Sequence, residues 1–105
     1  MTKVKINQGV CGFTTNIEAA GDDYGKVTLK VESGCGSVRK MFEDLGNTFD
    51  GYELCFNKPG CGPLFEYASK NFPVHCGCLA VAGITKTVEA ECKLALPKDA
   101  SITFE

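Results

Sequence analysis

The spacing of apolar residues changes once along the chain, and this change limits the folds open to it. Up to Glu32 apolar residues alternate with polar ones, as in half-buried strands. From Val38 onward they recur three and four residues apart, as on one face of a helix. Strands first and helices afterwards predict an α+β fold, in which helices pack on one face of a small, mostly antiparallel sheet.

Three alternating segments predict most of the sheet. Residues 3–7 place Val4 and Ile6 on one face. Residues 10–19 and 26–32 do the same, and "GDDYG" between them predicts a turn, so these two segments are expected to form a hairpin. Their expected inward side chains are Cys11, Phe13, Thr15 and Ile17 in the first, and Val27, Leu29 and Val31 in the second.

Three helices are expected after these strands. Pro63 suits the first position of the second helix, which runs to about Asn71. The apolar positions of the other two are Val38, Met41, Phe42 and Leu45 in the first, and Val81, Ile84, Val88, Cys92 and Ala95 in the last. Residues 52–56 fit a short strand or a turn of helix equally well, and a closing strand is expected with Ile102 and Phe104 inward.

Length and charge exclude several classes of protein. The chain has 105 residues, so residues 1–105 are expected to form one domain. The net charge is −2 and the lysines are scattered, which argues against binding to nucleic acid or to an anionic membrane. No apolar run is as long as a membrane span, and "MTKVKINQGV" lacks the apolar core of a signal peptide. A cytoplasmic protein is therefore expected.

Cysteine is the unusual component, with seven in 105 residues. Small secreted domains are rich in cysteine because disulfides replace a core. This chain is expected to have no export signal, and it has enough apolar residues for a core and an odd number of cysteines. In a reducing compartment such thiols serve packing, metal ligation or redox chemistry.

Three cysteines are expected at helix N-termini, each beside glycine: Cys35, Cys61 and Cys78. A helix N-terminus carries unpaired N–H groups and a partial positive charge of about half a unit. That field favours the thiolate, which is the form that binds metals and iron–sulfur clusters. Neighbouring glycines let backbone N–H groups approach a bound sulfur.

The other cysteines and the one histidine have competing interpretations. Cys92 and Cys55 are expected to pack in or beside the core. Cys11 fits packing and ligation about equally well. Cys76 is either an extra ligand or a redox partner of Cys78, and His75 is either a ligand or a surface residue.

One resemblance is local. The stretch "VTLKVESGC", followed much later by "CGC", is similar to the A-type iron–sulfur carriers, which have a strand ending in Ser-Gly-Cys and a C-terminal Cys-Gly-Cys. That resemblance implies Cys35, Cys76 and Cys78 as cluster ligands.

A second resemblance covers nearly the whole chain. The order "GVCGF", "VTLKVES", "YASKNFPVHCGC" and "GITKTVEAECKLALPKDASI" resembles a family of small uncharacterised domains from anaerobic bacteria and archaea. The positions that the resemblance carries over are Cys11, Cys35, His75 and Cys78. It implies a shared cysteine site and the cytoplasm of an anaerobe, and it implies no reaction.

Metal binding is the leading functional hypothesis. Cys11, Cys35 and Cys78 would hold an iron–sulfur cluster of the 4Fe–4S type, or zinc, with a fourth ligand from Cys61, Cys76 or His75. Candidate protein partners are one that exchanges the cluster or its electrons, and a second copy of the chain. The alternatives are metal-free thiol redox or sulfur transfer at Cys76-Gly77-Cys78 and a structural zinc or interaction module. Whether the protein is an enzyme stays open.

Overall fold

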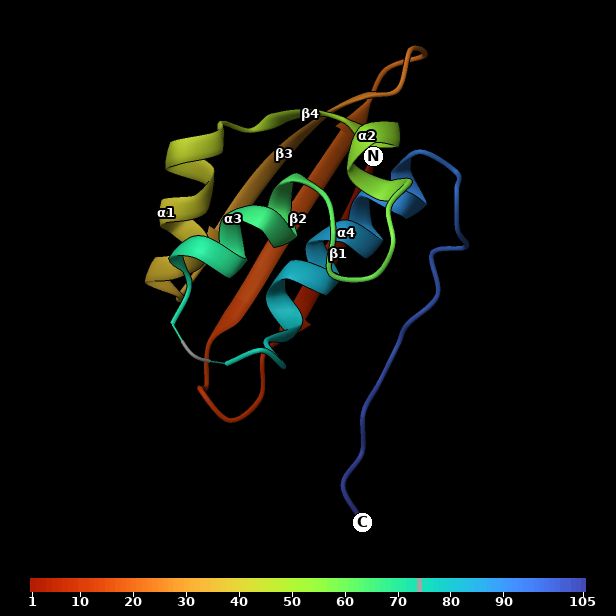
Figure 1. The fold of residues 1–105 in the computed structure, drawn as a ribbon. Helices are drawn as coiled ribbons and strands as arrows, with labels where there is room; N and C mark the ends of the chain where they lie inside the picture. Colours follow the sequence, from red (N-terminus) through yellow and green to blue (C-terminus); the bar gives the residue numbers. More distant parts are fainter. Residues whose placement is uncertain (74) are drawn as a thin grey trace.

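A four-stranded antiparallel sheet forms the frame of the molecule in the computed structural model, which describes residues 1–73 and 75–105. The strands follow one another in the order β1-β2-β3-β4, so each pairs with its neighbour in sequence (Figure 1). Their bounds are Thr2–Asn7 for β1, Thr14–Gly21 for β2, Lys26–Ser33 for β3 and Thr48–Asp50 for β4. The predicted α+β class and the hairpin of β2 and β3 are confirmed.

The register of the strands places the predicted apolar positions in rows. Ile17 of β2 lies opposite Val4 of β1 and Val31 of β3. In the same strand, Ala19 pairs with Leu29. Because successive side chains alternate between faces, these rows form the core face of the sheet, and the other face is polar.

Helices cover the core face. α1 spans Gly36–Leu45, α2 Gly51–Cys55, α3 Pro63–Asn71 and α4 Leu79–Glu91. α4 packs on β1 and β2, α1 packs on β3, and α3 packs against both α1 and α4 (Figure 1). The largest fully buried apolar side chains come from sheet and helices alike: Ile17, Leu29, Met41, Leu64, Ile84, Val27, Val38 and Val88.

β2 begins later than the alternation predicted, so the expected inward positions of Cys11 and Phe13 are wrong. Both residues are exposed and precede the strand. The chain turns between β1 and β2 through Gly9 and Gly12, whose φ angles are 90° and 76°. These left-handed conformations favour glycine, and they bend the segment that alternation alone reads as strand.

The described residues form four helices, where three were expected. The additional helix is α2, so the helical alternative for residues 52–56 is the correct one. It begins because the Asp50 carboxylate accepts hydrogen bonds from the backbone N–H groups of Tyr52 and Glu53, at 3.0 and 3.3 Å. Asp50 also ends β4, so one residue closes a strand and caps a helix.

The expected ends of α1 and α4 also need correction. Leu45, placed on the apolar face of α1, is 37% exposed because it lies in the last turn. α4 ends at Glu91, with Cys92 as its C-cap, and Ala95 lies beyond the helix and is exposed.

The predicted closing strand is absent from the described residues. Residues 96–105 run as an extended tail away from the body (Figure 1), and Ile102 and Phe104 are 68% and 95% exposed. Alternation makes a segment suitable for a strand, but a strand also needs a neighbour that supplies hydrogen bonds. The tail has the pattern of a strand and does not pair with its own sheet.

Candidate functional site

Three of the predicted cysteine positions belong to segments that reach the same end of the molecule. These segments are the β1–β2 turn with Cys11, the β3–α1 connection with Cys35, and the start of α4 with Cys78 (Figure 1). We call this region the thiol end and define it by Cys11, Cys35, Cys76 and Cys78.

Two contacts fix the arrangement of the thiol end. The Phe13 ring covers Gly34, where an added Cβ would lie 3.0 Å from Phe13 Cδ1. This contact holds the β1–β2 turn against the residue before Cys35. Ile6 packs on Gly83, where an added Cβ would lie 2.5 Å from Ile6 Cδ1. This contact holds the first turns of α4 against the C-terminal end of β1.

Cys35 is the N-cap residue of α1 and is half-buried. Its backbone N–H donates to Ser33 Oγ at 3.1 Å, and its carbonyl accepts from the Arg39 N–H at 3.1 Å. Arg39 also donates from Nη1 to the Ser33 carbonyl at 2.8 Å. The backbone of Cys35 is therefore well held, while its side chain makes no capping hydrogen bond to the helix.

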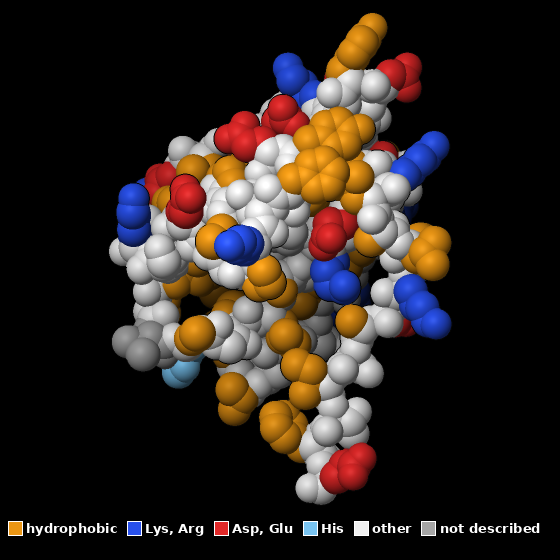
Figure 2. All heavy atoms as spheres, turned by 45° about the vertical axis from the view of Figure 1, so that its right-hand side comes forward, with side chains coloured by type: hydrophobic (Ala, Val, Ile, Leu, Met, Phe, Trp, Pro, Cys, Tyr) orange, Lys and Arg blue, Asp and Glu red, His pale blue; other side chains and the backbone are white. Residues whose placement is uncertain are grey.

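Cys78 is the N-cap residue of α4, is half-buried, and likewise makes no side-chain capping bond. Its N–H donates to the His75 carbonyl at 3.1 Å, which closes a turn over residues 75–78. Cys76 and His75 are exposed on this turn. Figure 2 shows the histidine, in pale blue, at the surface near the lower end of the molecule.

Cys11 lies at the surface of the β1–β2 turn. Gln8 closes the base of this turn because its N–H donates to the Phe13 carbonyl at 3.1 Å. The Cys11 sulfur accepts a long hydrogen bond from Gln8 Nε2, at 4.0 Å. The thiol is therefore accessible.

The structure places Cys61 near α2. Cys61 precedes α3, and the next residue, Gly62, fits closely against Asn57 and the Leu54 carbonyl. The other end of α3 is the one that approaches the thiol end, because Asn71 and Phe72 line the same surface depression as Gly36, at the start of α1. Cys61 thus belongs to a different part of the molecule from the start of α1.

Cys55 and Cys92 are half-buried against the core, as the sequence predicted. Cys92 Sγ lies against Gly51, one helical turn before Cys55 on α2. Burial, with smaller effects from Glu89 and Cys92, raises the pKa of Cys55 to about 12. Burial also raises the pKa of Cys92. Both groups stay neutral thiols at physiological pH and are poor ligands or nucleophiles.

All seven cysteines are free thiols. Across residues 1–73 and 75–105, no three His, Cys, Asp or Glu side chains stand close enough together to hold a metal ion. The thiol end therefore brings the segments of Cys11, Cys35, Cys76 and Cys78 to one place without assembling a finished ligand set.

A polar depression of about 320 Å³ lies between α1 and α3 and is lined by Gly36, the residue after Cys35; the sequence did not predict it. The Lys40 ammonium is 2.7 Å from the Asp44 carboxylate, and the Tyr67 hydroxyl donates to the same carboxylate. These hydrogen bonds lower the pKa of Asp44 and raise the pKa of Tyr67. The spacing of Lys40 and Asp44 was visible in the sequence, but Tyr67 comes from another helix and gave no signal.

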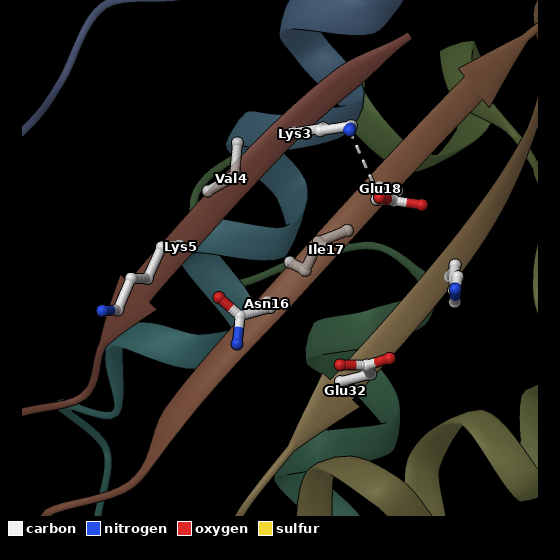
Figure 3. A pocket seen from close by; sticks show the side chains of 8 residues that line it. Lys3, Val4, Lys5, Asn16, Ile17, Glu18 and Glu32 are labelled. Atoms are coloured by element: carbon white, nitrogen blue, oxygen red, sulfur yellow. Dashed lines mark ion pairs between the residues drawn. The ribbon is translucent and has the colours of Figure 1, made fainter.

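A second depression, of about 340 Å³, lies on the open face of the sheet (Figure 3). Lysines and acidic residues alternate there, and Lys3 Nζ is 3.7 Å from the Glu18 carboxylate. This face is the one turned away from the helices, and none of the residues that line it is a cysteine.

The fold and the thiol end together define a small α+β domain in which the segments that carry four of the seven cysteines reach one end. The model of DUF6951, a family of unknown function, matches residues 2–104, and the chain belongs to this family. No curated protein and no solved structure matched the chain. The local resemblance to A-type iron–sulfur carriers thus received no support from these comparisons.

Among the described residues, none of the helices combines the length and the apolar character that a membrane crossing requires.

Proposed function

We propose that the protein binds a metal at the thiol end, an iron–sulfur cluster in the first place and zinc as the alternative. Cys11, Cys35 and Cys78 would be ligands, and Cys76 would supply the fourth thiol. The observation that carries the proposal is that three segments lie at the same end of the fold. Two of them are the N-termini of helices whose N-cap residue is a cysteine, and the third is a turn that contains two glycines.

The two helix N-termini support binding of a negatively charged sulfur. Neither Cys35 nor Cys78 caps its helix with a side-chain hydrogen bond. The first N–H groups of α1 and α4 are thus left to other acceptors. A thiolate, or a sulfide of a cluster, is such an acceptor and is further stabilised by the helix dipole.

The choice of Cys76 as the fourth ligand follows from position. Cys76 shares the 75–78 turn with Cys78 and is exposed, so its sulfur is accessible. Cys61 is tied to α2 by the contacts of Gly62, and it would have to leave them to reach the start of α1. His75 stays the second choice because it shares the same turn.

Metal binding would also have to bring the sulfurs closer together. The ligands of a metal site are held by the metal as much as by the chain, and binding free energy contributes to ordering them. The exposed turns that carry Cys11 and Cys76 are the segments that would close over Cys35 and Cys78. In the bound state the metal would supply Lewis acidity or electron storage, and the chain's residues would position it.

The test is metal analysis with an absorption spectrum on protein purified without oxygen. A visible charge-transfer band with iron and sulfide indicates a cluster, and a colourless protein with one zinc per chain indicates zinc. Protein that folds and carries neither, even after reconstitution with ferrous iron and sulfide or with zinc, contradicts the proposal.

Two matched variants locate the site. Cys76→Ser should reduce metal content severely, whereas Cys61→Ser should leave it unchanged, although both replace an exposed thiol by a hydroxyl. Loss of metal in Cys61→Ser and retention in Cys76→Ser would assign the fourth ligand to Cys61.

A metal-free dithiol is the second candidate function, and one observation favours it. Cys76 and Cys78 lie in one short turn, so their pairing needs no other segment. With a small-molecule disulfide as the oxidant, one new S–S bond would form between them. The oxidant's S–S bond would break, and its two thiol products would take up the two electrons and the two protons.

Alkylation rates test this candidate. In metal-free protein, Cys76 and Cys78 should react with iodoacetamide much faster than Cys92, whose pKa is raised by burial. Equal rates at all three positions would rule the dithiol out.

A further inference from the structure

The outer edge of β1 offers unpaired backbone groups. Among the described residues, β1 is the first strand of the sheet and pairs with β2 alone. The Gln8 N–H donates to the Phe13 carbonyl, which continues the register of β1 and β2 one residue beyond both strands, and hydrogen-bonding direction alternates along an antiparallel strand. The backbone N–H and C=O groups of Thr2, Val4 and Ile6 therefore point toward β2. The backbone groups of Lys3, Lys5 and Asn7 point outward, away from the sheet. Such an edge is a template for another strand.

The C-terminal tail has the pattern of the missing strand. In residues 101–105, "SITFE", apolar and polar side chains alternate. Ile102 and Phe104 are 68% and 95% exposed, although large apolar side chains are stabilised by burial. The tail stands off the body and extends below it in Figures 1 and 2.

Edge and tail match in both polarity and charge. A strand added to β1 would place Ile102 and Phe104 on the core face, which α4 covers. The other residues of the tail would fall on the open face, where β1 carries Lys3 and Lys5 (Figure 3). Glu105 would then lie on the same face as these two lysines and opposite to them in charge.

We propose that residues 101–105 of one chain pair with the β1 edge of a second copy, and that the exchange is reciprocal. The tail of a single chain points away from its own sheet, and this position suits a partner. Reciprocal exchange buries both tails and covers both β1 edges in one closed, two-fold arrangement. The added strand would be held by backbone hydrogen bonds, and its apolar side chains would fix the register.

The mass of the full chain in solution, followed over a dilution series by sedimentation or light scattering, tests this proposal. We expect a dimer that dissociates on dilution. Phe104→Asp should shift the midpoint of dissociation at least tenfold toward higher concentration, because an aspartate cannot be buried against α4 without a partner. This variant changes an exposed side chain and should not affect the fold of the monomer.

A backbone variant tests the edge itself. Lys5→Pro removes one outward N–H and should weaken the dimer, whereas Lys5→Ala keeps that N–H and serves as the matched control. Circular dichroism checks that both variants fold. If Lys5→Pro does not fold, the dissociation of the Phe104→Asp dimer on dilution still tests the proposal.

Three outcomes would overturn the proposal. The first is a chain that stays monomeric at every concentration. The second is a dimer that Phe104→Asp leaves intact. The third is a monomer whose free energy of unfolding is lowered by Phe104→Asp by the same amount at every protein concentration. That result would mean that the tail pairs with β1 of its own chain.

Discussion

At the scale of the residue, burial separates the cysteines into two groups. Cys55 is the last residue of α2 and packs against the core, and burial raises the pKa of its thiol to about 12 from an ordinary value of 9.0. Cys11 and Cys76 lie at the surface. Sequence reasoning assigned Cys55 correctly because its neighbours Leu54 and Phe56 are apolar. It placed Cys11 wrongly because the turn that begins near Gly9 continues through Gly12, so that β2 starts only at Thr14.

The raised pKa of Cys55 predicts how stability depends on pH. The unfolded state releases the Cys55 proton near pH 9, and the folded state releases it only near pH 12. The stabilisation is therefore fully present below pH 9 and is lost as pH rises toward 12. Urea unfolding of Cys55→Ala should show a cost of about 1 kcal/mol at pH 7 from the small cavity. Its stability should then fall less steeply than that of the wild type between pH 9 and pH 11. Parallel curves would contradict the burial of Cys55.

At the scale of the element, the contact of α2 with α4 depends on a missing side chain. A Cβ at Gly51 would lie 2.3 Å from Cys92 Sγ and 3.1 Å from the Gly25 carbonyl oxygen. Gly51→Ala should thus destabilise the fold by about 1–3 kcal/mol through overpacking, despite the better helix propensity of alanine.

A double-mutant cycle isolates the cause of that loss. Cys92→Ala removes the sulfur that the new methyl group would meet, so Gly51→Ala should cost less in the Cys92→Ala background than in the wild type. The measurement is the free energy of urea unfolding of the four proteins. Additive costs would mean that Gly51→Ala acts through the Gly25 carbonyl instead.

Most elements were visible in the sequence, and the exceptions have local causes. Val4 and Ile6, and Val27 to Val31, sit in strands as the alternation predicted. The sequence predicted α2 only as one of two alternatives, a helix or a short strand. Asp50, the residue that caps α2, is also the last residue of a strand. The tail was assigned to a strand from its alternation, which carries no information on whether a partner strand exists.

At the scale of the whole molecule, tertiary packing decides which thiols are neighbours. The sequence indicated three cysteines at three helix N-termini, and local patterns treat them alike. α3, however, brings its C-terminal residues toward the start of α1, whereas Cys61, at its other end, lies beside α2. Which ends of helices meet depends on how the helices cross the sheet, and no spacing within one helix contains that information.

Hydrogen exchange on metal-loaded and metal-free protein gives the decisive prediction for the thiol end. If one metal site joins the turn of residues 9–12 with that of residues 75–78, both should gain protection together on loading, because a bound ligand stabilises only states in which its site is formed. α2, which lies apart from the thiol end, serves as the internal control and should not change. Protection confined to residues 75–78 would mean that Cys11 is no ligand and that the chemistry belongs to Cys76 and Cys78 alone. Protection of α2 would move the site to Cys61.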